Sequence, residues 1–248
     1  MSRGWIVMTR LALVTGASRG IGRGIARALA SAGYRVAANY RANDDAARSL
    51  TEEHAIPAYK WDVADYQASR EGVERVVADH GAIDILVNNA GISPDRFMHK
   101  MGDDVWRQVI DTNLNGYFNV THQVIAPMRK AGFGRIVNIA SLSAFAPNYG
   151  ETAYGAAKGA IISFTKALAK ESIARGITVN AVAPGYIDTD MVRVAPQEWL
   201  DDLVRDHIPA GRLGRVEDVA RCVLFLVADD ADFITGATVD VNGGQIMR

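Results

Sequence analysis

The chain has 248 residues, which is long enough for one large α/β domain and short for two. Its 49% hydrophobic and 22% charged residues are ordinary for a globular protein, and 27 Lys and Arg residues nearly balance 28 Asp and Glu residues. This balance excludes the basic footprint of a nucleic-acid-binding protein, and no apolar run approaches the roughly 20 residues that span a bilayer.

The first predicted strand begins only at Leu11, so residues 1–10 are expected to be an N-terminal extension, and Met8 is an alternative start. The apolar stretch near the N-terminus is too short for a secretory signal, and no small-residue cleavage site follows it. The single cysteine, Cys222, cannot form a disulfide within the chain, which fits a reducing compartment. These features predict a cytoplasmic protein.

Short β-rich runs then alternate with amphipathic helical stretches to the end of the chain. The predicted strands are residues 11–15, 35–39, 58–61, 83–88, 135–139, 178–183 and 238–241. The predicted helices are residues 20–31, 44–53, 65–79, 103–130, 154–175 and 216–228. This alternation, with strands so apolar, predicts a parallel sheet covered by helices on both faces. We therefore expect a single-domain, doubly wound α/β Rossmann fold over residues 11–248, with a seven-stranded parallel sheet.

Residues 186–214 form the only long stretch without clear periodicity. Such segments are often lids or binding loops, and disorder is an equally simple interpretation. A substrate lid is the interpretation that we favour.

A glycine-rich turn, TGASRGIG, follows the first strand at residues 15–22. Gly16, Gly20 and Gly22 allow a tight turn and the close approach of a pyrophosphate to the start of a helix, where free N–H groups bind anions. The spacing does not match G-x-G-x-x-G, and a turn without a ligand is the alternative. The strand–turn–helix setting favours a dinucleotide.

The second strand ends in Asn39-Tyr40-Arg41, with no acidic residue before Asp44. Enzymes specific for NAD usually place an acidic residue there, on the ribose 2′-hydroxyl. Arg19 and Arg41 could instead face a 2′-phosphate, which a guanidinium binds bidentately. This predicts NADP as the cofactor, although Arg41 as a solvated loop residue is the alternative.

Tyr154 and Lys158 lie four residues apart at the start of a long predicted helix, so their side chains share one face. Ser141 stands 13 residues before Tyr154, just past a strand, at the edge of the sheet where α/β active sites lie. Reduction of a ketone leaves an alkoxide that needs a proton. Tyr154 could donate it, with Lys158 and the oxidised nicotinamide lowering its pKa from about 10. Ser141 would bind the carbonyl oxygen, and Asn113 could hold a water that links Lys158 to solvent.

The sequence resembles the short-chain dehydrogenase/reductase family from Leu11 to the C-terminus. The motifs that carry the resemblance are TGASRGIG at 15–22, NNAG at 88–91, the Asn113 segment, Ser141, YGAAK at 154–158 and Pro184-Gly185. The resemblance implies the catalytic residues Asn113, Ser141, Tyr154 and Lys158. It also implies contacts of Asp62 with adenine, of Asn89 and Lys158 with the two riboses, and of Ile187 and Thr189 with the carboxamide. The full predicted cofactor set is Gly16, Ser18, Arg19, Gly20, Ile21, Gly22, Asn39, Tyr40, Arg41, Asp62, Val63, Asn89, Ala90, Gly91, Tyr154, Lys158, Pro184, Gly185, Ile187 and Thr189.

Within the family, the chain most resembles reductases of 3-oxoacyl thioesters. The segments concerned are residues 91–101, 111–125, 134–141, 184–192 and 208–215 and the ending VNGGQIM. FNVTHQVI and the 148–152 loop favour CoA as the acyl carrier, whereas Arg175, assisted by Arg129 and Lys130, would suit an acyl-carrier protein. These basic groups could equally be a solvated helix end. Reduction of a sugar, a cyclic ketone or a secondary-metabolite ketone stays open as an alternative.

Two other functional classes fit the sequence less well. The five histidines, at positions 54, 80, 99, 122 and 207, show no zinc-type spacing with Cys222, so no metal site is predicted. A nucleotide-binding sensor on the same fold would not need the four residues Asn113, Ser141, Tyr154 and Lys158, so their presence together argues against a sensor.

The resemblance also implies a homotetramer, formed through helices at about 105–130 and 154–175 and the C-terminal strand region. Both helices carry more apolar residues than one sheet face requires, although packing within one subunit would also explain them. The residues concerned are Tyr117, Phe118, Val120, Ile161, Ile162 and Phe164.

Overall fold

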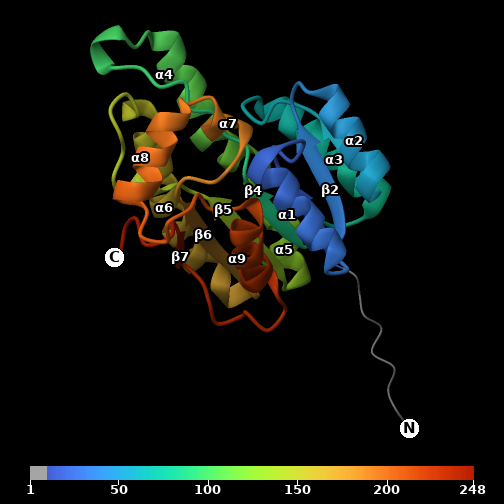
Figure 1. Ribbon diagram of the computed structural model, residues 1–248. Coiled ribbons are helices and arrows are strands. Elements are labelled where there is room, and N and C mark those ends of the chain that lie inside the picture. The colour runs from blue at the N-terminus through green and yellow to red at the C-terminus, as the bar shows by residue number, and fades with distance from the viewer. Residues whose placement is uncertain (1–9) are drawn as a thin grey trace.

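Seven parallel strands form one sheet at the centre of the computed structural model, which describes residues 10–248 (Figure 1). The strands are β1 (Leu11–Val14), β2 (Arg35–Tyr40), β3 (Ala58–Lys60), β4 (Ile85–Asn88), β5 (Gly134–Ile139), β6 (Ile177–Pro184) and β7 (Thr238–Val241). Their order is β3-β2-β1-β4-β5-β6-β7, and every neighbouring pair is parallel. This confirms the predicted fold class. The predicted extension and the alternative start at Met8 lie outside the described residues, except for Arg10.

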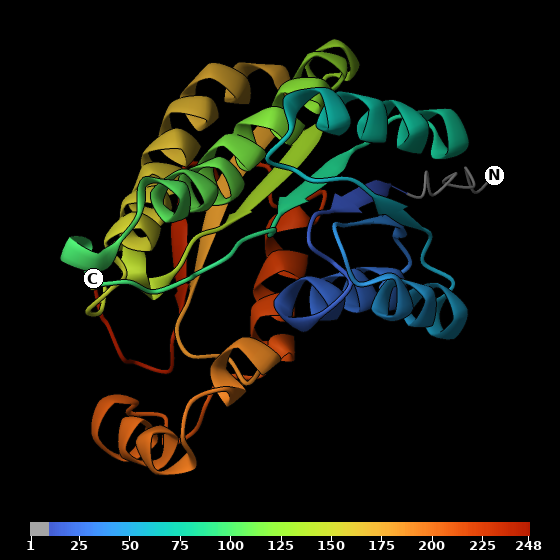
Figure 2. The same cartoon turned by 90° about the horizontal axis from the view of Figure 1, so that it is seen from above.

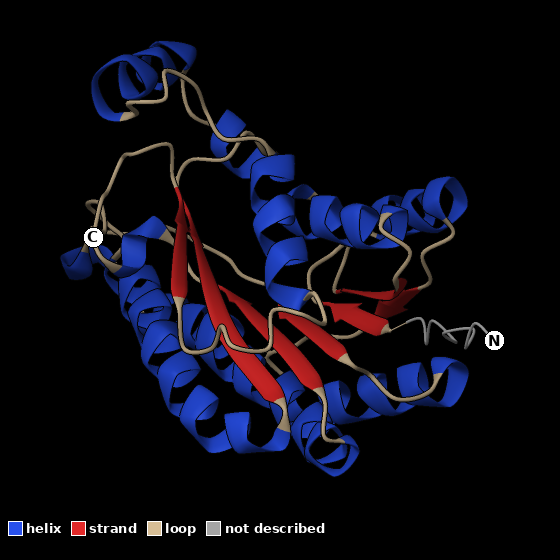
Figure 3. Cartoon of the chain, turned by 90° about the horizontal axis from the view of Figure 1, so that it is seen from below, coloured by secondary structure: helices blue, strands red, loops and turns tan. Residues whose placement is uncertain are grey.

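Helices cover both faces of the sheet (Figures 2 and 3). One face carries α1 (Gly20–Ser31), α2 (Asp44–His54) and α9 (Val216–Val227), and the other carries α3 (Tyr66–His80), α5 (Gly116–Ala131) and α6 (Thr152–Ser172). Ile25 and Val223 bury against the first face, and Val76 and Val120 against the second. The order of strands reverses between β1 and β4, and the crevice at such a switch point is where open α/β sheets bind ligands.

The long helical region predicted over residues 103–130 is helical throughout, but it is not one regular α-helix. The structure has α4 (Asp103–Ile110), a π-helical segment η2 (Asp111–Asn115) and then α5. The buried Asn113 side chain donates to the backbone carbonyls of Val109 and Ile92, which fixes the wider turn. A residue inserted into a helix in this way is frequent at functional sites.

Residues 186–214 are also more regular than expected, because they contain α7 (Asp190–Arg193) and α8 (Gln197–His207). Leu200 and Leu203 are the buried positions of α8, and their spacing of three is a helical period. This short amphipathic stretch behind Pro196 was missed. The interpretation of residues 186–214 as a lid stays a prediction. Within the described residues, no helix has the length and hydropathy to cross a membrane.

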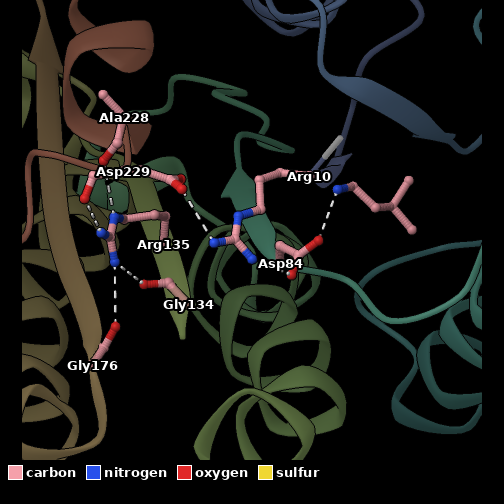
Figure 4. A network of polar contacts seen from close by, with 8 residues as sticks. Arg10, Asp84, Gly134, Arg135, Gly176, Ala228 and Asp229 are labelled. Atoms are coloured by element: carbon pink, nitrogen blue, oxygen red, sulfur yellow. Dashed lines mark hydrogen bonds and ion pairs between the residues drawn. The ribbon is translucent and has the colours of Figure 1, made fainter. Parts of the chain in front are cut away.

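A polar network ties the amino ends of the strands together (Figure 4). The buried Arg135 guanidinium donates to the carbonyl oxygens of Gly134, Gly176, Ala228 and Asp229 at 3.0–3.3 Å. Arg10 forms ion pairs with Asp84 and Asp229, and its guanidinium and that of Arg135 stack on the Phe133 ring at 3.6 and 4.5 Å. Four of the five N–H groups of the Arg135 guanidinium therefore have carbonyl acceptors at this end of the sheet.

Candidate active site

A cavity of about 930 Å³ opens at the carboxyl ends of the strands. The network around Arg135 lies at the other end of the same strands. It runs from the end of β2, past the glycine turn after β1, to Ser141, Tyr154 and Lys158. Every residue predicted to bind the cofactor lines it, and so do the predicted catalytic residues except Asn113. The cavity is elongated along the switch point, in the place and with the lining expected for a dinucleotide.

The glycine turn can exist only because three positions lack a side chain or tolerate positive φ. Gly16 and Gly20 have φ of +63° and +54°. A Cβ at Gly22 would lie 2.4 Å from both Asn89 Nδ2 and Gly16 O. No side chain caps the N-terminus of α1, so its free N–H groups are left for an anionic ligand.

Asn39 and Asn89, both predicted to contact the cofactor, use their side chains to build this turn. Asn89 Nδ2 donates to Thr15 O at 2.9 Å and to Gly16 O at 3.2 Å. Asn39 Oδ1 accepts from Gly16 N at 3.2 Å. Both residues line the cavity as expected, but much of their hydrogen-bonding capacity holds the backbone that would carry the phosphates.

Charges of both signs surround the end of the cavity beyond β2. Arg19 and Arg41 are exposed and line it, and Arg41 Nη1 lies 3.6 Å from Asp62 Oδ2. Asp44 also lines it, but Lys60 Nζ donates to both carboxylate oxygens at 2.9 and 3.0 Å and holds the pKa of Asp44 below its usual value. Asp44 and Asp45 of α2 are thus both paired, with Lys60 and Arg48, whereas Arg19 has no ion-pair partner within the described residues.

Lys158 is almost completely buried at the inner end of the cavity. Its Nζ donates to Ile139 O at 2.7 Å and to the Tyr117 hydroxyl at 3.1 Å, and it lies 5.7 Å from the centroid of the Tyr154 ring. Burial lowers the pKa of Lys158 to about 7. A lysine with this pKa exchanges protons near neutrality, as a proton relay requires.

Tyr154 extends from the first turn of α6 beside Ser141, which follows β5. Burial raises the pKa of Tyr154 to about 12, and the adjacent Ser141 hydroxyl acts in the opposite direction. The predicted lowering by Lys158 together with the oxidised nicotinamide stays a prediction.

Asn113 lies behind the cavity rather than in its wall. Its Oδ1 accepts from Ile92 N at 3.1 Å, and its Nδ2 donates to Ile92 O and Val109 O at 2.9 Å. A Cβ at Gly91 would lie 2.6 Å from Asn113 Oδ1 and 3.7 Å from Lys158 Nζ. Asn113 thus fixes the backbone next to Lys158, and the predicted water relay stays a prediction.

Several lining residues were not predicted. They are Ala42, Asn43, Asp44, Asp45 and Trp61 near the end of β2 and β3, Ile92, Thr112, Ile139 and Ala140 near the catalytic residues, and Asp190, Met191, Val192 and Val194 from α7 and the residue after it. Tyr117 was named only as an apolar residue, although it stands one helical turn after Asn113. That spacing was the signal available in the sequence.

Outside the residues that line the cavity, the segment after β6 contacts the 148–150 loop. Asn148 Nδ2 donates to the Tyr186 hydroxyl at 2.8 Å, and the Tyr186 ring meets Trp199 of α8 edge-on at 5.8 Å. Arg96 N donates to Gly150 O at 3.0 Å. Within residues 10–248 no three His, Cys, Asp or Glu side chains gather as metal ligands would.

Comparison with known proteins assigns the family. The family model described as enoyl-(acyl carrier protein) reductase matches residues 16–245. The chain belongs to the short-chain dehydrogenase/reductase family, whose reductases use nicotinamide cofactors.

Among curated members of this family, an acetoacetyl-CoA reductase of Rhizobium meliloti is 56% identical over 96% of this chain and 99% of its own length. An acetoacetyl-CoA reductase of Shinella zoogloeoides is 54% identical over 97% of this chain and its own full length. A 3-oxoacyl-[acyl-carrier-protein] reductase of Staphylococcus epidermidis is 43% identical, also over 97% and its full length.

Proposed function

We propose that this enzyme reduces a 3-oxoacyl thioester to the 3-hydroxyacyl thioester with NADPH. The observation that carries the proposal is the placement of Ser141, Tyr154 and Lys158 at the inner end of a cavity that also holds the glycine turn. The substrate class is supported by the similarity to acetoacetyl-CoA reductases and 3-oxoacyl-[acyl-carrier-protein] reductases.

The residues of the cavity fit a dinucleotide. The cradle at Gly16 and Gly22 has no room for a Cβ, and the N-terminus of α1 is uncapped. When bound there, NADPH supplies the hydride that is added to the ketone carbon.

The chain's own residues then handle the oxygen and its proton. The Ser141 hydroxyl donates to the substrate carbonyl oxygen and stabilises the charge that develops as the C=O π bond breaks. The Tyr154 hydroxyl transfers its proton to the resulting alkoxide, which completes the alcohol. Lys158 stabilises the tyrosinate left behind and returns a proton to it.

The preference for the 2′-phosphate is proposed from Arg19 and Arg41. Within residues 10–248, Arg19 has no side-chain partner. Arg41 Nη1 lies 3.6 Å from Asp62 Oδ2, and the Arg41 side chain is half exposed. An exposed ion pair as long as Arg41–Asp62 is weak, so Arg41 is free to bind a phosphate together with Arg19.

CoA is the carrier that the geometry of one subunit favours. Arg129 lies in the last turn of α5 and Arg175 just after α6, both at the amino ends of the strands, and Arg129 donates to Glu171 O at 2.7 Å. The 21 residues of α6 separate this end from Tyr154 by about 30 Å. An acyl-carrier protein docked on Arg175 would have to deliver its acyl chain to a neighbouring subunit.

We further propose a homotetramer in the cytoplasm. Tyr117, Val120, Ile161 and Ile162 do not support the assembly, because they pack within their own subunit. Phe118 of α5 is 48% exposed, and Phe225 and Phe233 near the C-terminal strand are also exposed. Exposed aromatic side chains on these elements support contacts between subunits. A monomeric mass by light scattering at micromolar concentration would reject this assembly.

The substrate proposal is tested by following NADPH oxidation with acetoacetyl-CoA, acetoacetyl-acyl-carrier protein, crotonyl-CoA and a cyclic ketone. We expect the highest kcat/KM with acetoacetyl-CoA. Crotonyl-CoA is included because the matching family model is described as an enoyl reductase. Faster reduction of crotonyl-CoA or of the cyclic ketone than of both thioester ketones would contradict the proposal.

A further inference from the structure

The Tyr117 hydroxyl lies inside the group of atoms that holds Lys158. It accepts a hydrogen bond from Lys158 Nζ at 3.1 Å and donates one to Ile139 O at 2.8 Å. Lys158 Nζ donates to the same carbonyl oxygen at 2.7 Å. The three groups form a closed triangle in which the phenol oxygen is an acceptor for the lysine.

Tyr117 reaches this place because of the π-helical segment. Asn113, in the middle of η2, turns its side chain to the backbone of Ile92, and Tyr117 follows one turn later in α5. Its ring is 1% exposed and packs with Ile161 and Ala181. An apolar ring would fill that space equally well, so packing does not explain why the residue carries a hydroxyl.

The hydroxyl matters because Lys158 has few other acceptors. An ammonium has three N–H donors, and only two of those of Lys158 have partners within the described residues. The titratable groups that face it are Tyr117 from α5 and Tyr154 on its own helix, and no carboxylate acts on its pKa, which burial alone lowers to about 7. Burial raises the pKa of Tyr117 well above its ordinary value, so Tyr117 stays neutral.

We propose that Tyr117 is a positioning residue whose hydroxyl keeps the Lys158 amino group protonated and leaves its third N–H for the cavity. The inference rests on the proposed function, in which the ammonium supports proton donation by Tyr154. Removing the Tyr117 hydroxyl takes an acceptor away from an N–H of the ammonium. The lone pair of the neutral amine does not use this acceptor and loses nothing. The ammonium is therefore lost at lower pH.

The test is Tyr117→Phe, which removes one oxygen and keeps the ring. We expect kcat/KM for acetoacetyl-CoA reduction to fall by less than about threefold at pH 6 and by about tenfold at pH 8.5, because the basic limb moves down by about one pH unit. Tyr66→Phe is the matched control, since the Tyr66 hydroxyl contacts only His122 at the surface. An equal loss at every pH, or no loss, would overturn the proposal.

A readout without turnover separates this inference from the proposed function. The 13C-ε NMR signal of Lys158, assigned by its absence in Lys158→Met, is titrated in the wild-type protein and in Tyr117→Phe. We expect the midpoint to be about one pH unit lower in the variant. This shift in protein that binds NADPH but reduces no thioester would sink the proposed function alone, and equal midpoints would sink the role of Tyr117. Tyr117→Leu gives the same comparison if Tyr117→Phe fails to fold.

Discussion

The two ends of the sheet each bury one cation, and they treat it in opposite ways. At the amino end, Arg135 donates to four backbone carbonyls and lies on the Phe133 ring (Figure 4). At the carboxyl end, Lys158 has two acceptors and keeps one N–H for the cavity. Arg135 does not line the cavity, and its bonds to the backbone tie the start of β5 to the segments that precede β6 and β7. Lys158 lines the cavity and is available for chemistry, at a cost in stability.

The largest effect is expected for Lys158→Met, which removes the buried cation that lines the cavity. We expect kcat/KM to fall by at least about 10³-fold, because both tyrosinate stabilisation and reprotonation are lost. The folded state should keep or gain stability, since the Tyr117 hydroxyl still donates to Ile139 O. Steady-state kinetics and urea unfolding measure the two changes. Lys166→Met, an exposed position on the same helix, is the control.

The stability gain of Lys158→Met should depend on pH. The folded protein holds the pKa of Lys158 at about 7, below the ordinary lysine value of 10.5, so charging this group opposes folding. The wild-type protein therefore gains stability relative to the variant as the pH rises from 7 to 10.5, and the advantage of the variant is greatest below pH 7. Urea unfolding at pH 6.5 and 9.5 checks the sign, and a pH-independent difference would contradict the assignment.

Arg135→Met should give the converse result. It removes the guanidinium donor from four carbonyl oxygens, of which Ala228 O still accepts from Ala231 N, and we expect a loss of about 3–5 kcal/mol in the free energy of unfolding. Activity per folded molecule should change less than about twofold, because the network lies at the other end of the sheet. Arg27→Met, exposed on α1, serves as the control. A loss of kcat without a loss of stability would break the comparison between the two ends.

Gly22→Ala tests the cradle at the carboxyl end. The new Cβ would lie 2.4 Å from Asn89 Nδ2 and Gly16 O, so the turn must shift. We expect NADPH to bind at least about tenfold more weakly in fluorescence titrations. Gly159→Ala is the control, because the nearest atom to its Cβ would be Ala144 O at 3.7 Å. Unchanged binding by Gly22→Ala would remove the turn from the site.

Arg41→Ala is expected to have the smallest effect. The KM for NADPH should rise about tenfold, and the KM for NADH should stay within about twofold, since only NADPH carries the charge that Arg41 binds. Initial rates with each cofactor measure this. Arg48→Ala, whose guanidinium pairs with Asp45, controls for the loss of positive charge near this end. An equal change for both cofactors would count against the 2′-phosphate assignment.

The sequence predicted what depends on local pattern. The predicted β7 at residues 238–241 and α1 at residues 20–31 match the structure, because period and breakers mark them clearly. Strand–helix alternation sufficed for the sheet, since parallel connections of one hand leave few topologies. The glycine turn and the Tyr154–Lys158 pair could be predicted because each lies within one short segment, where spacing along the chain determines which residues are neighbours in the structure.

What the sequence could not supply depends on contacts between distant segments. The π-helical turn exists because the Asn113 side chain bonds to Ile92, 21 residues away. The use of Asn89 in building the turn requires β1 and β4 to be neighbours. The raised pKa of Tyr154 follows from burial that only the folded chain creates. Tyr117 carried a signal, its place one turn after Asn113, but its meaning needed the position of Lys158.

The central claim is that Tyr154 donates the proton in a cavity that binds NADPH. It is tested most directly by measuring acetoacetyl-CoA reduction by the wild-type protein and by Tyr154→Phe at saturating NADPH, with NADPH affinity measured in parallel. We predict that the variant binds NADPH as the wild type does and loses about 10²–10⁴-fold in kcat/KM. A loss of less than tenfold, with unchanged NADPH affinity, would contradict the account.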